Sequence, residues 1–226
     1  MVKLRSRMDL RDGGAARELI ASLLAQALGL DVPAPAVVDL VPELADGIMD
    51  VDASVAVRTS AGLNFGCQFL AGGWRAWQIH ESLQRRQLDA GFDVFAFDAL
   101  IENPDRSGKD ARPTNLLTDG DRLVVIDHEA AFSFLLALFA PAEPWTPDAS
   151  GYLRDHIFYP SLRAMLVSGE RIRASLEALS PESLTAIGDA VPEEWHGAFV
   201  PSILEHVKAV AEHANEFVTA TKQILR

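Results

Sequence analysis

The chain has 226 residues, of which 49% are hydrophobic, enough to bury a sizeable core as one large domain or two small lobes. Its 20 basic and 32 acidic side chains give a net charge of −12, which disfavours binding to nucleic acid or anionic lipid through bulk charge. The single cysteine, Cys67, excludes an internal disulfide and a cysteine-based zinc site, and it favours a reducing, cytoplasmic compartment.

The sequence predicts neither a signal peptide nor a membrane span. Residues 1–14 contain no apolar core of signal-peptide length. The longest apolar run, residues 130–140, is too short to cross about 30 Å of hydrocarbon as a helix. We therefore expect a water-soluble protein.

The region up to about residue 80 has the pattern of strands around one helix. Residues 2–5 could end a strand, and apolar side chains at helical spacing predict a helix over residues 14–30. Residues 36–41 and 53–59 have the composition of strands, and residues 62–77 that of a strand or loop edge.

The middle of the chain combines an apolar helix with a turn and a hairpin. The phenylalanine-rich stretch over residues 92–101 predicts the helix. An Asp119-Gly120 pair predicts a tight turn, so residues 115–117 and 123–126 should pair as two short strands.

Helices are expected to dominate from about residue 150 to the end. Ser180 is a suitable N-cap, and Pro181 follows it at the first helical position. Residues 201–226 carry apolar side chains on one face and predict one long amphipathic helix packed on a core.

Three oxygen-bearing side chains occur around the central turn and hairpin, namely Asp105, Asn115 and Asp127. Phosphoryl transfer needs a carboxylate to orient the attacking hydroxyl and oxygen ligands to hold Mg²⁺ against the phosphates. The three residues supply these oxygens in the right order and indicate a Mg-nucleotide site. Taken singly, each is more typical of a turn, a cap or a strand end.

The same region resembles a known family. AFDALIENPDRSGKDARPTNLL followed by LVVIDHEAAF resembles the catalytic unit of HipA-like kinases and, more distantly, that of type II phosphatidylinositol 4-kinases. The opening VKLR and RELIASLLAQALGLDVPAPAVVDL are similar to the lysine strand and glutamate helix of HipA-like proteins. The resemblance covers most of residues 1–132. It implies an α+β, two-lobed, protein-kinase-like fold, with a small strand and helix lobe over residues 1–85 and a mostly helical lobe over residues 86–226.

Carried over position by position, the resemblance implies an ATP- and Mg²⁺-dependent kinase that transfers the γ-phosphate to a hydroxyl. Asp105 would be the catalytic aspartate, and Asn115 and Asp127 would be the metal ligands. Lys3 would contact the ATP phosphates, with Glu18 as its ion-pair partner.

Two further residues and the acceptor follow from the same resemblance. Arg106 would brace the catalytic loop, and His128 would lie behind the metal aspartate. The hydroxyl acceptor is expected to be a protein serine or threonine, while a small-molecule or lipid hydroxyl stays open.

Two departures from the family pattern leave alternatives open. Asp105 and Asn115 lie ten positions apart, about twice the family's spacing, so residues 107–111 look like a small insertion. The family also places a glycine-rich, phosphate-covering loop before the lysine strand, and Lys3 leaves no room for it. The chain is therefore expected to begin downstream of the family's usual start or to lack this loop.

Both departures favour an alternative, a catalytically weak or dead pseudokinase that binds a nucleotide or a protein partner. A third alternative is a non-catalytic helical protein in which the turn is only a turn.

Overall fold

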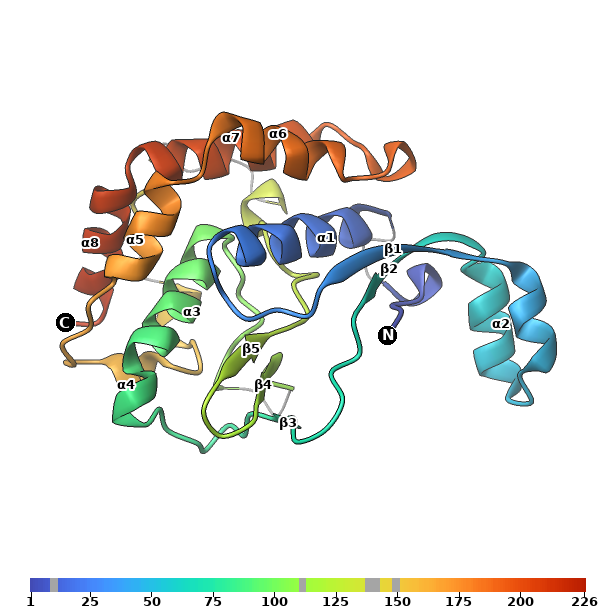
Figure 1. Ribbon diagram of the computed structural model, residues 1–226, viewed down its shortest axis with the longest axis horizontal. Helices are drawn as coiled ribbons and strands as arrows, with labels where there is room; N and C mark the ends of the chain where they lie inside the picture. Colours follow the sequence, from blue (N-terminus) through green and yellow to red (C-terminus); the bar gives the residue numbers. More distant parts are fainter. Residues whose placement is uncertain (9–11, 110–112, 137–142, 148–150) are drawn as a thin grey trace.

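The computed structural model describes residues 1–8, 12–109, 113–136, 143–147 and 151–226. It contains helices and two small antiparallel sheets, compatible with the predicted α+β class (Figure 1). Part of the expected insertion (110–111) and part of the longest apolar run (137–140) lie outside the described residues. Among the described helices, none combines the length and the apolar character that crossing a membrane requires.

The N-terminal helix packs on a two-stranded sheet. Helix α1 (Asp12–Ala27) confirms the predicted helix, and strands β1 (Pro35–Leu40) and β2 (Gly62–Cys67) pair antiparallel beside it. The backbone N–H of Lys3 donates to the Phe65 carbonyl at 2.9 Å, so the start of the chain runs along β2. This pairing fixes the Lys3 side chain between the sheet and α1.

The strand predicted over residues 53–59 is wrong, because these residues form helix α2 (Val51–Thr59). The Asp50 carboxylate accepts a hydrogen bond from the Ala53 backbone N–H at 2.7 Å and caps the helix. A local N-cap thus outweighs the strand propensity of the valines that follow it. With the short helix η2 (Pro42–Gly47), α2 forms an excursion between β1 and β2 that projects from the molecule (Figure 1).

The predicted apolar helix and the predicted hairpin are both confirmed. Helix α3 (Leu88–Leu100) buries almost its whole length, as expected for its phenylalanine-rich run. Strands β4 (Leu116–Thr118) and β5 (Leu123–Val125) pair across the predicted turn, where Gly120 has φ +100°. The short strand β3 (Arg75–Ala76) extends this hairpin to a three-stranded sheet.

Helices dominate the chain beyond residue 150, as predicted. The Ser180 side chain accepts a hydrogen bond from the Ser183 backbone N–H at 3.2 Å, which confirms the predicted cap. The remaining α-helices are α4 (Tyr159–Leu162), α5 (Glu170–Glu177), α6 (Pro181–Asp189), α7 (Phe199–Glu212) and α8 (Ala214–Ile224). Short 3-10 helices are η1 (Arg5–Arg7), η3 (Arg85–Gln87), η4 (Ser133–Leu136), η5 (Tyr152–Arg154) and η6 (Glu193–Trp195).

The single long helix predicted over residues 201–226 is wrong, since the chain breaks between α7 and α8. His213 leaves the helical conformation with φ −120° and ψ 34°. Its ring stacks on Trp145 with centroids 3.8 Å apart. This partner lies far away in the sequence, so the apolar spacing alone gives no sign of the break.

One continuous core joins the two predicted lobes. Buried side chains from α1, α3 and α7, such as Leu24, Phe95 and Val207, belong to the same hydrophobic cluster. Helix α1 lies between α6 and the β3–β4–β5 sheet (Figure 1). The division at residue 85 stays a prediction.

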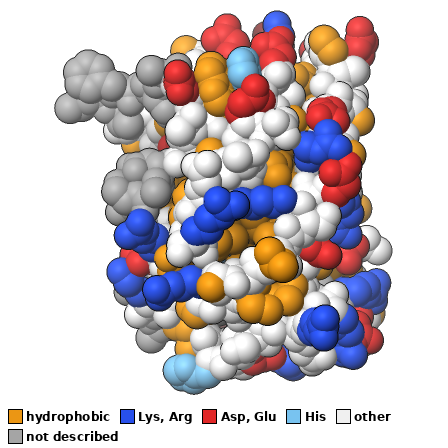
Figure 2. Space-filling model, turned by 90° about the vertical axis from the view of Figure 1, so that its left-hand side faces the viewer, with side chains coloured by type: hydrophobic (Ala, Val, Ile, Leu, Met, Phe, Trp, Pro, Cys, Tyr) orange, Lys and Arg blue, Asp and Glu red, His pale blue; other side chains and the backbone are white. Residues whose placement is uncertain are grey.

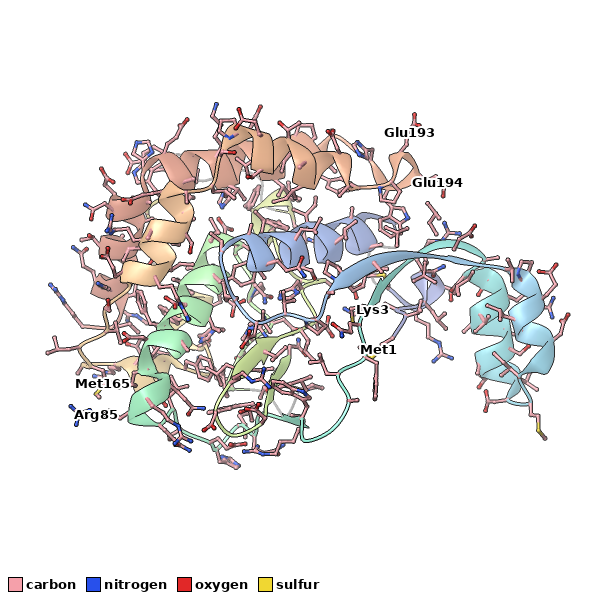
Figure 3. All side chains as sticks on the ribbon, viewed as in Figure 1. Met1, Lys3, Arg85, Met165, Glu193 and Glu194 are labelled. Carbon is pink, nitrogen blue, oxygen red and sulfur yellow. The ribbon has the colours of Figure 1, made fainter. Side chains whose placement is uncertain are left out.

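The face that carries α5 and α8 mixes acidic and basic side chains around a group of hydrophobic ones (Figure 2). Met165 lies at this side of the molecule (Figure 3), and Leu166 beside it is fully exposed. A cavity here is lined by residues 164–167, Lys222 and the chain end. It contains none of the predicted site residues.

Candidate functional site

The three side chains predicted to carry the chemistry line one cleft. Asp105, Asn115 and Asp127 belong to its wall, together with Arg17 from α1 and Glu129 from the segment after β5. The Asn115 side-chain amide donates to the Asp105 carboxylate with Nδ2 and Oδ2 2.7 Å apart. The structure therefore brings residues from the central turn and from both ends of the hairpin to one place.

The turn that carries Asp105 is held by side chains from its own neighbourhood. The Asn103 side-chain oxygen accepts from the Asp105 backbone N–H at 3.2 Å, an Asx turn. The Asn103 amide in turn donates to the buried Asp98 carboxylate at 3.0 Å. The position of Asp105 is thus fixed from α3.

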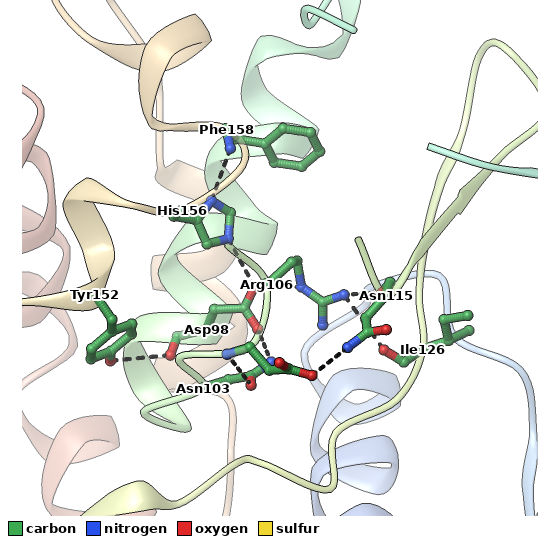
Figure 4. Close-up of polar contacts among 9 residues, drawn as sticks. Asp98, Asn103, Arg106, Asn115, Ile126, Tyr152, His156 and Phe158 are labelled. Atoms are coloured by element: carbon green, nitrogen blue, oxygen red, sulfur yellow. Dashed lines mark hydrogen bonds and ion pairs between the residues drawn. The ribbon is translucent and has the colours of Figure 1, made fainter. Parts of the chain in front are cut away.

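Arg106 ties this turn to the hairpin (Figure 4). Its Nε donates to Asp98 Oδ2 at 2.6 Å, and both side chains are completely buried. Its Nη1 donates to the Asn115 carbonyl and, at 3.5 Å, to the Ile126 carbonyl. One guanidinium therefore links the turn of Asp105 to Asn115 and to Ile126, the residue before Asp127.

Sequence reasoning missed His156, the third member of this buried cluster. The His156 Nε2 lies 2.9 Å from Asp98 Oδ2, and its Nδ1 accepts from the Phe158 backbone N–H at 3.0 Å. The proton is therefore assigned to Nε2, which donates to Asp98. Burial lowers the pKa of His156 and outweighs the nearby carboxylate, so the ring is neutral at pH 7.

Asp98 stays ionised in this cluster. Burial alone would raise the pKa of its carboxyl, but Arg106 and His156 outweigh burial and bring the pKa to about 2. The sequence does carry one signal, because a carboxylate inside the apolar run of α3 needs a buried partner. The sequence does not identify the residue that pairs with Asp98.

Lys3, which is labelled in Figure 3, lies between two carboxylates. Its Nζ is 2.8 Å from Glu18 Oε2 and 2.5 Å from Asp127 Oδ1. Burial opposes the charge on Lys3, but the two carboxylates outweigh burial and raise the pKa of the ammonium. The structure thus pairs Lys3 with Glu18 as expected and also places it against Asp127.

Glu18 is buried and contacts both Lys3 and His128. Besides Lys3, it accepts from the His128 backbone N–H at 2.7 Å, and the His128 ring lies 3.6 Å from its second oxygen. Burial raises the pKa of Glu18, while His128 and Lys3 lower it more strongly, and the result is a pKa of about 2. The carboxylate is therefore ionised throughout the physiological range.

A second, more apolar cavity adjoins the cleft. Lys3, Glu18 and Asp127 line it together with His128, and its remaining walls include Val32, Pro33, Phe65, Cys67 and Ile126. Asp127 belongs to both cavities. The carboxylate therefore lies where an apolar pocket meets a polar cleft.

Asn115 and Asp127 share an uncommon backbone conformation. Their φ angles are +53° and +59°, in the left-handed region that Asn and Asp tolerate better than most residues. Such conformations cost free energy and gather at functional sites. The two candidate metal ligands, at the two ends of the hairpin, thus both have a left-handed backbone.

The residues present fit a hard divalent cation and a phosphate chain. The Asn115 amide nitrogen donates to Asp105, so the side-chain oxygen of Asn115 can bind a cation. The Asp127 side chain is 42% exposed and can do the same. Within the described parts of the chain, no group of three His, Cys, Asp or Glu is arranged to hold a metal ion. A cation would therefore take an amide and a carboxylate oxygen from the protein and its other ligands from phosphate and water, as Mg²⁺ does.

The extra residues between Asp105 and Asn115 do not separate them. The Gly108 backbone N–H donates to the Asp155 carbonyl at 2.7 Å, and the Lys109 ammonium pairs with the Asp155 carboxylate at 2.5 Å. The described part of the insertion is therefore held by Asp155, the residue after η5, while Asp105 and Asn115 stay in contact.

Comparison with known protein families gives a match that covers nearly the whole chain. A protein-family model described as HipA-like kinase matches residues 2–222. This range includes all five predicted site residues and extends well beyond residue 132, where the resemblance seen in the sequence ends. No curated protein matches this chain.

Proposed function

This chain belongs to the HipA-like kinase family, and from that premise we propose that it transfers the γ-phosphate of ATP, with Mg²⁺, to a protein serine or threonine. The family supports kinase-type phosphotransfer; the nucleotide, the cation and the acceptor are our proposal. We also propose the two-lobed arrangement, with lobes over residues 1–85 and 86–226. The observation that carries the proposal is the shared cleft of Asp105, Asn115 and Asp127.

Asp105 is the proposed catalytic residue. Its carboxylate lies in the polar cleft, held by the Asn103 turn and the Asn115 amide, where it would orient the acceptor hydroxyl and accept its proton. Asn115 and Asp127 would hold Mg²⁺ through their side-chain oxygens. When bound, the cation neutralises the charge that develops on the phosphates.

Lys3 and Glu18 would bind the nucleotide on the other side of Asp127. The Lys3 ammonium, oriented by Glu18 at 2.8 Å, would contact the phosphates. The apolar walls of the adjoining cavity, formed by side chains such as Val32 and Phe65, suit a flat aromatic base. The single cysteine supports a reducing, cytoplasmic location for this activity.

A binding and turnover experiment tests the proposal. We would measure Mg²⁺-dependent ATP binding by thermal shift and then phosphate release and autophosphorylation, for wild type, Asp127→Asn and Asp46→Asn. Asp46 is the matched control, because its carboxylate pairs with Arg58 on the surface. We expect Asp127→Asn alone to lose the Mg²⁺ dependence and the turnover. If wild type does not bind Mg-ATP, the proposal fails.

The same experiment separates the kinase from its alternative. Mg-ATP binding without turnover in wild type would support a pseudokinase that acts as a nucleotide- or protein-binding module. Phosphate transfer by wild type in a lysate, read by mass spectrometry against Asp127→Asn, would identify the acceptor.

A further inference from the structure

Arg17 is a buried cation on the wall of the polar cleft. The residue is only 4% exposed, yet it lines the same cleft as Asp105. Neighbouring helix residues point about 100° apart, so Arg17 and Glu18 serve different sides of α1. Glu18 reaches Lys3 and the apolar cavity, while Arg17 reaches the polar cleft.

The surroundings of Arg17 leave its donors incompletely used. Within the described part of the chain, its buried Nε has no hydrogen-bond partner. Burial lowers the pKa of its guanidinium, and the charge of Glu129 only partly opposes this effect. A buried charged group with an unpaired donor is costly, and the charge of an anion beside the guanidinium would offset part of that cost.

The cleft needs such a cation if an anion is to enter it. Its wall carries the carboxylates of Asp105, Asp127 and Glu129, which repel phosphate. Lys3 already pairs with Glu18 and Asp127 at the edge of the apolar cavity. Arg17 supplies positive charge on the side where Asp105 lies.

We infer that Arg17 binds the terminal phosphate of the nucleotide, the group that is transferred. The inference rests on the proposed function and adds to it a phosphate contact that no motif in the sequence assigns. A planar guanidinium presents paired N–H donors that match two phosphate oxygens. Because Asp127 belongs to both cavities, a nucleotide with its base in the apolar cavity would extend its last phosphate past Asp127 toward Arg17 and Asp105.

The test compares the binding of ATP and ADP, which differ by that one phosphate. Isothermal titration with Mg²⁺ present would be run on wild type, Arg17→Met, Arg17→Lys and Arg163→Met, an exposed control. We expect Arg17→Met to weaken ATP binding at least about tenfold, the loss of one charge-assisted contact, and to leave ADP binding nearly unchanged. Arg17→Lys should fall between, since it keeps the charge but not the paired donors.

Each other outcome is informative. An equal loss of ATP and ADP affinity, or no loss, would overturn the role of Arg17 while leaving the proposed function in place. Wild type that binds neither nucleotide would remove both proposals. Circular dichroism of the unliganded variants shows whether they fold; if Arg17→Met does not, an unchanged ATP-to-ADP ratio in Arg17→Lys overturns the inference.

Discussion

The amide of Asn115 donates a hydrogen bond to the carboxylate of Asp105 over 2.7 Å, although ten positions separate the two residues. The contact joins the turn after α3 to the start of β4. It places the proposed catalytic carboxylate beside a proposed metal ligand. Variants of these two residues therefore test separate steps at one site.

Replacing the Asp105 carboxylate should stop turnover and spare binding. In Asp105→Asn the side chain keeps its size but can no longer accept the hydroxyl proton, so we expect phosphate transfer to fall at least about 100-fold. Mg-ATP affinity should stay close to that of wild type. Asp155→Asn, which removes the partner of Lys109, is the control. Full turnover in Asp105→Asn would contradict the assignment.

The side chain and the backbone of Asn115 can be tested apart. Asn115→Ala and Asn115→Gly both remove the amide oxygen, so both should need more Mg²⁺ for ATP binding. Only Ala is strained at φ +53°, and we expect it to be about 1 kcal/mol less stable than Gly in urea unfolding. Equal Mg²⁺ dependence in both variants and wild type would rule out a ligand role.

Glu18 should contribute to stability in a pH-dependent way. Its pKa of about 2 in the folded protein lies below the usual value of 4.5, so the folded state favours the ionised form. That contribution is fully present above about pH 5 and is lost as the pH falls toward 2. Urea unfolding of wild type and Glu18→Gln should therefore differ most at pH 7 and converge in acid. A gap that does not depend on pH would contradict this assignment.

Breaking the Asp98–Arg106 pair should destabilise the whole protein. Asp98→Asn leaves the Arg106 charge buried without its carboxylate, and we expect a loss of about 3–5 kcal/mol in the free energy of unfolding. The exposed pair of Asp46 and Arg58 is the matched control, where Asp46→Asn should cost at most about 1 kcal/mol. Similar losses in both variants would show that burial does not set the strength of the Asp98 contact.

Local signals predicted the elements that depend on local chemistry. The α3 helix, the hairpin around Gly120 and the start of α6 at Ser180 all follow from apolar spacing, turn residues or a cap. Helix α2 also has a local signal in its N-cap Asp50, which outweighs the strand propensity of the valines that follow it. The break at His213 had none, because its partner Trp145 comes from another part of the chain.

The candidate site shows the same difference between residues with a signal in the sequence and residues without one. The order of Asp105, Asn115 and Asp127 was visible in the sequence, and the structure places all three in one cleft. His156 and Arg17 were not found, because their importance comes from burial and from neighbours that only folding supplies. A charged residue within an apolar helix is the signal that could have directed attention to Arg17.

Arg106 has a consequence for how the molecule responds to heat. Its guanidinium joins the end of α3 to both strands of the hairpin through contacts with Asp98, Asn115 and Ile126. The contacts with Asp98 and Asn115 are buried, so separating the hairpin from α3 would expose an ionised pair. Backbone amides around the cleft should therefore exchange with deuterated solvent only when the entire fold opens, and thermal inactivation should coincide with melting.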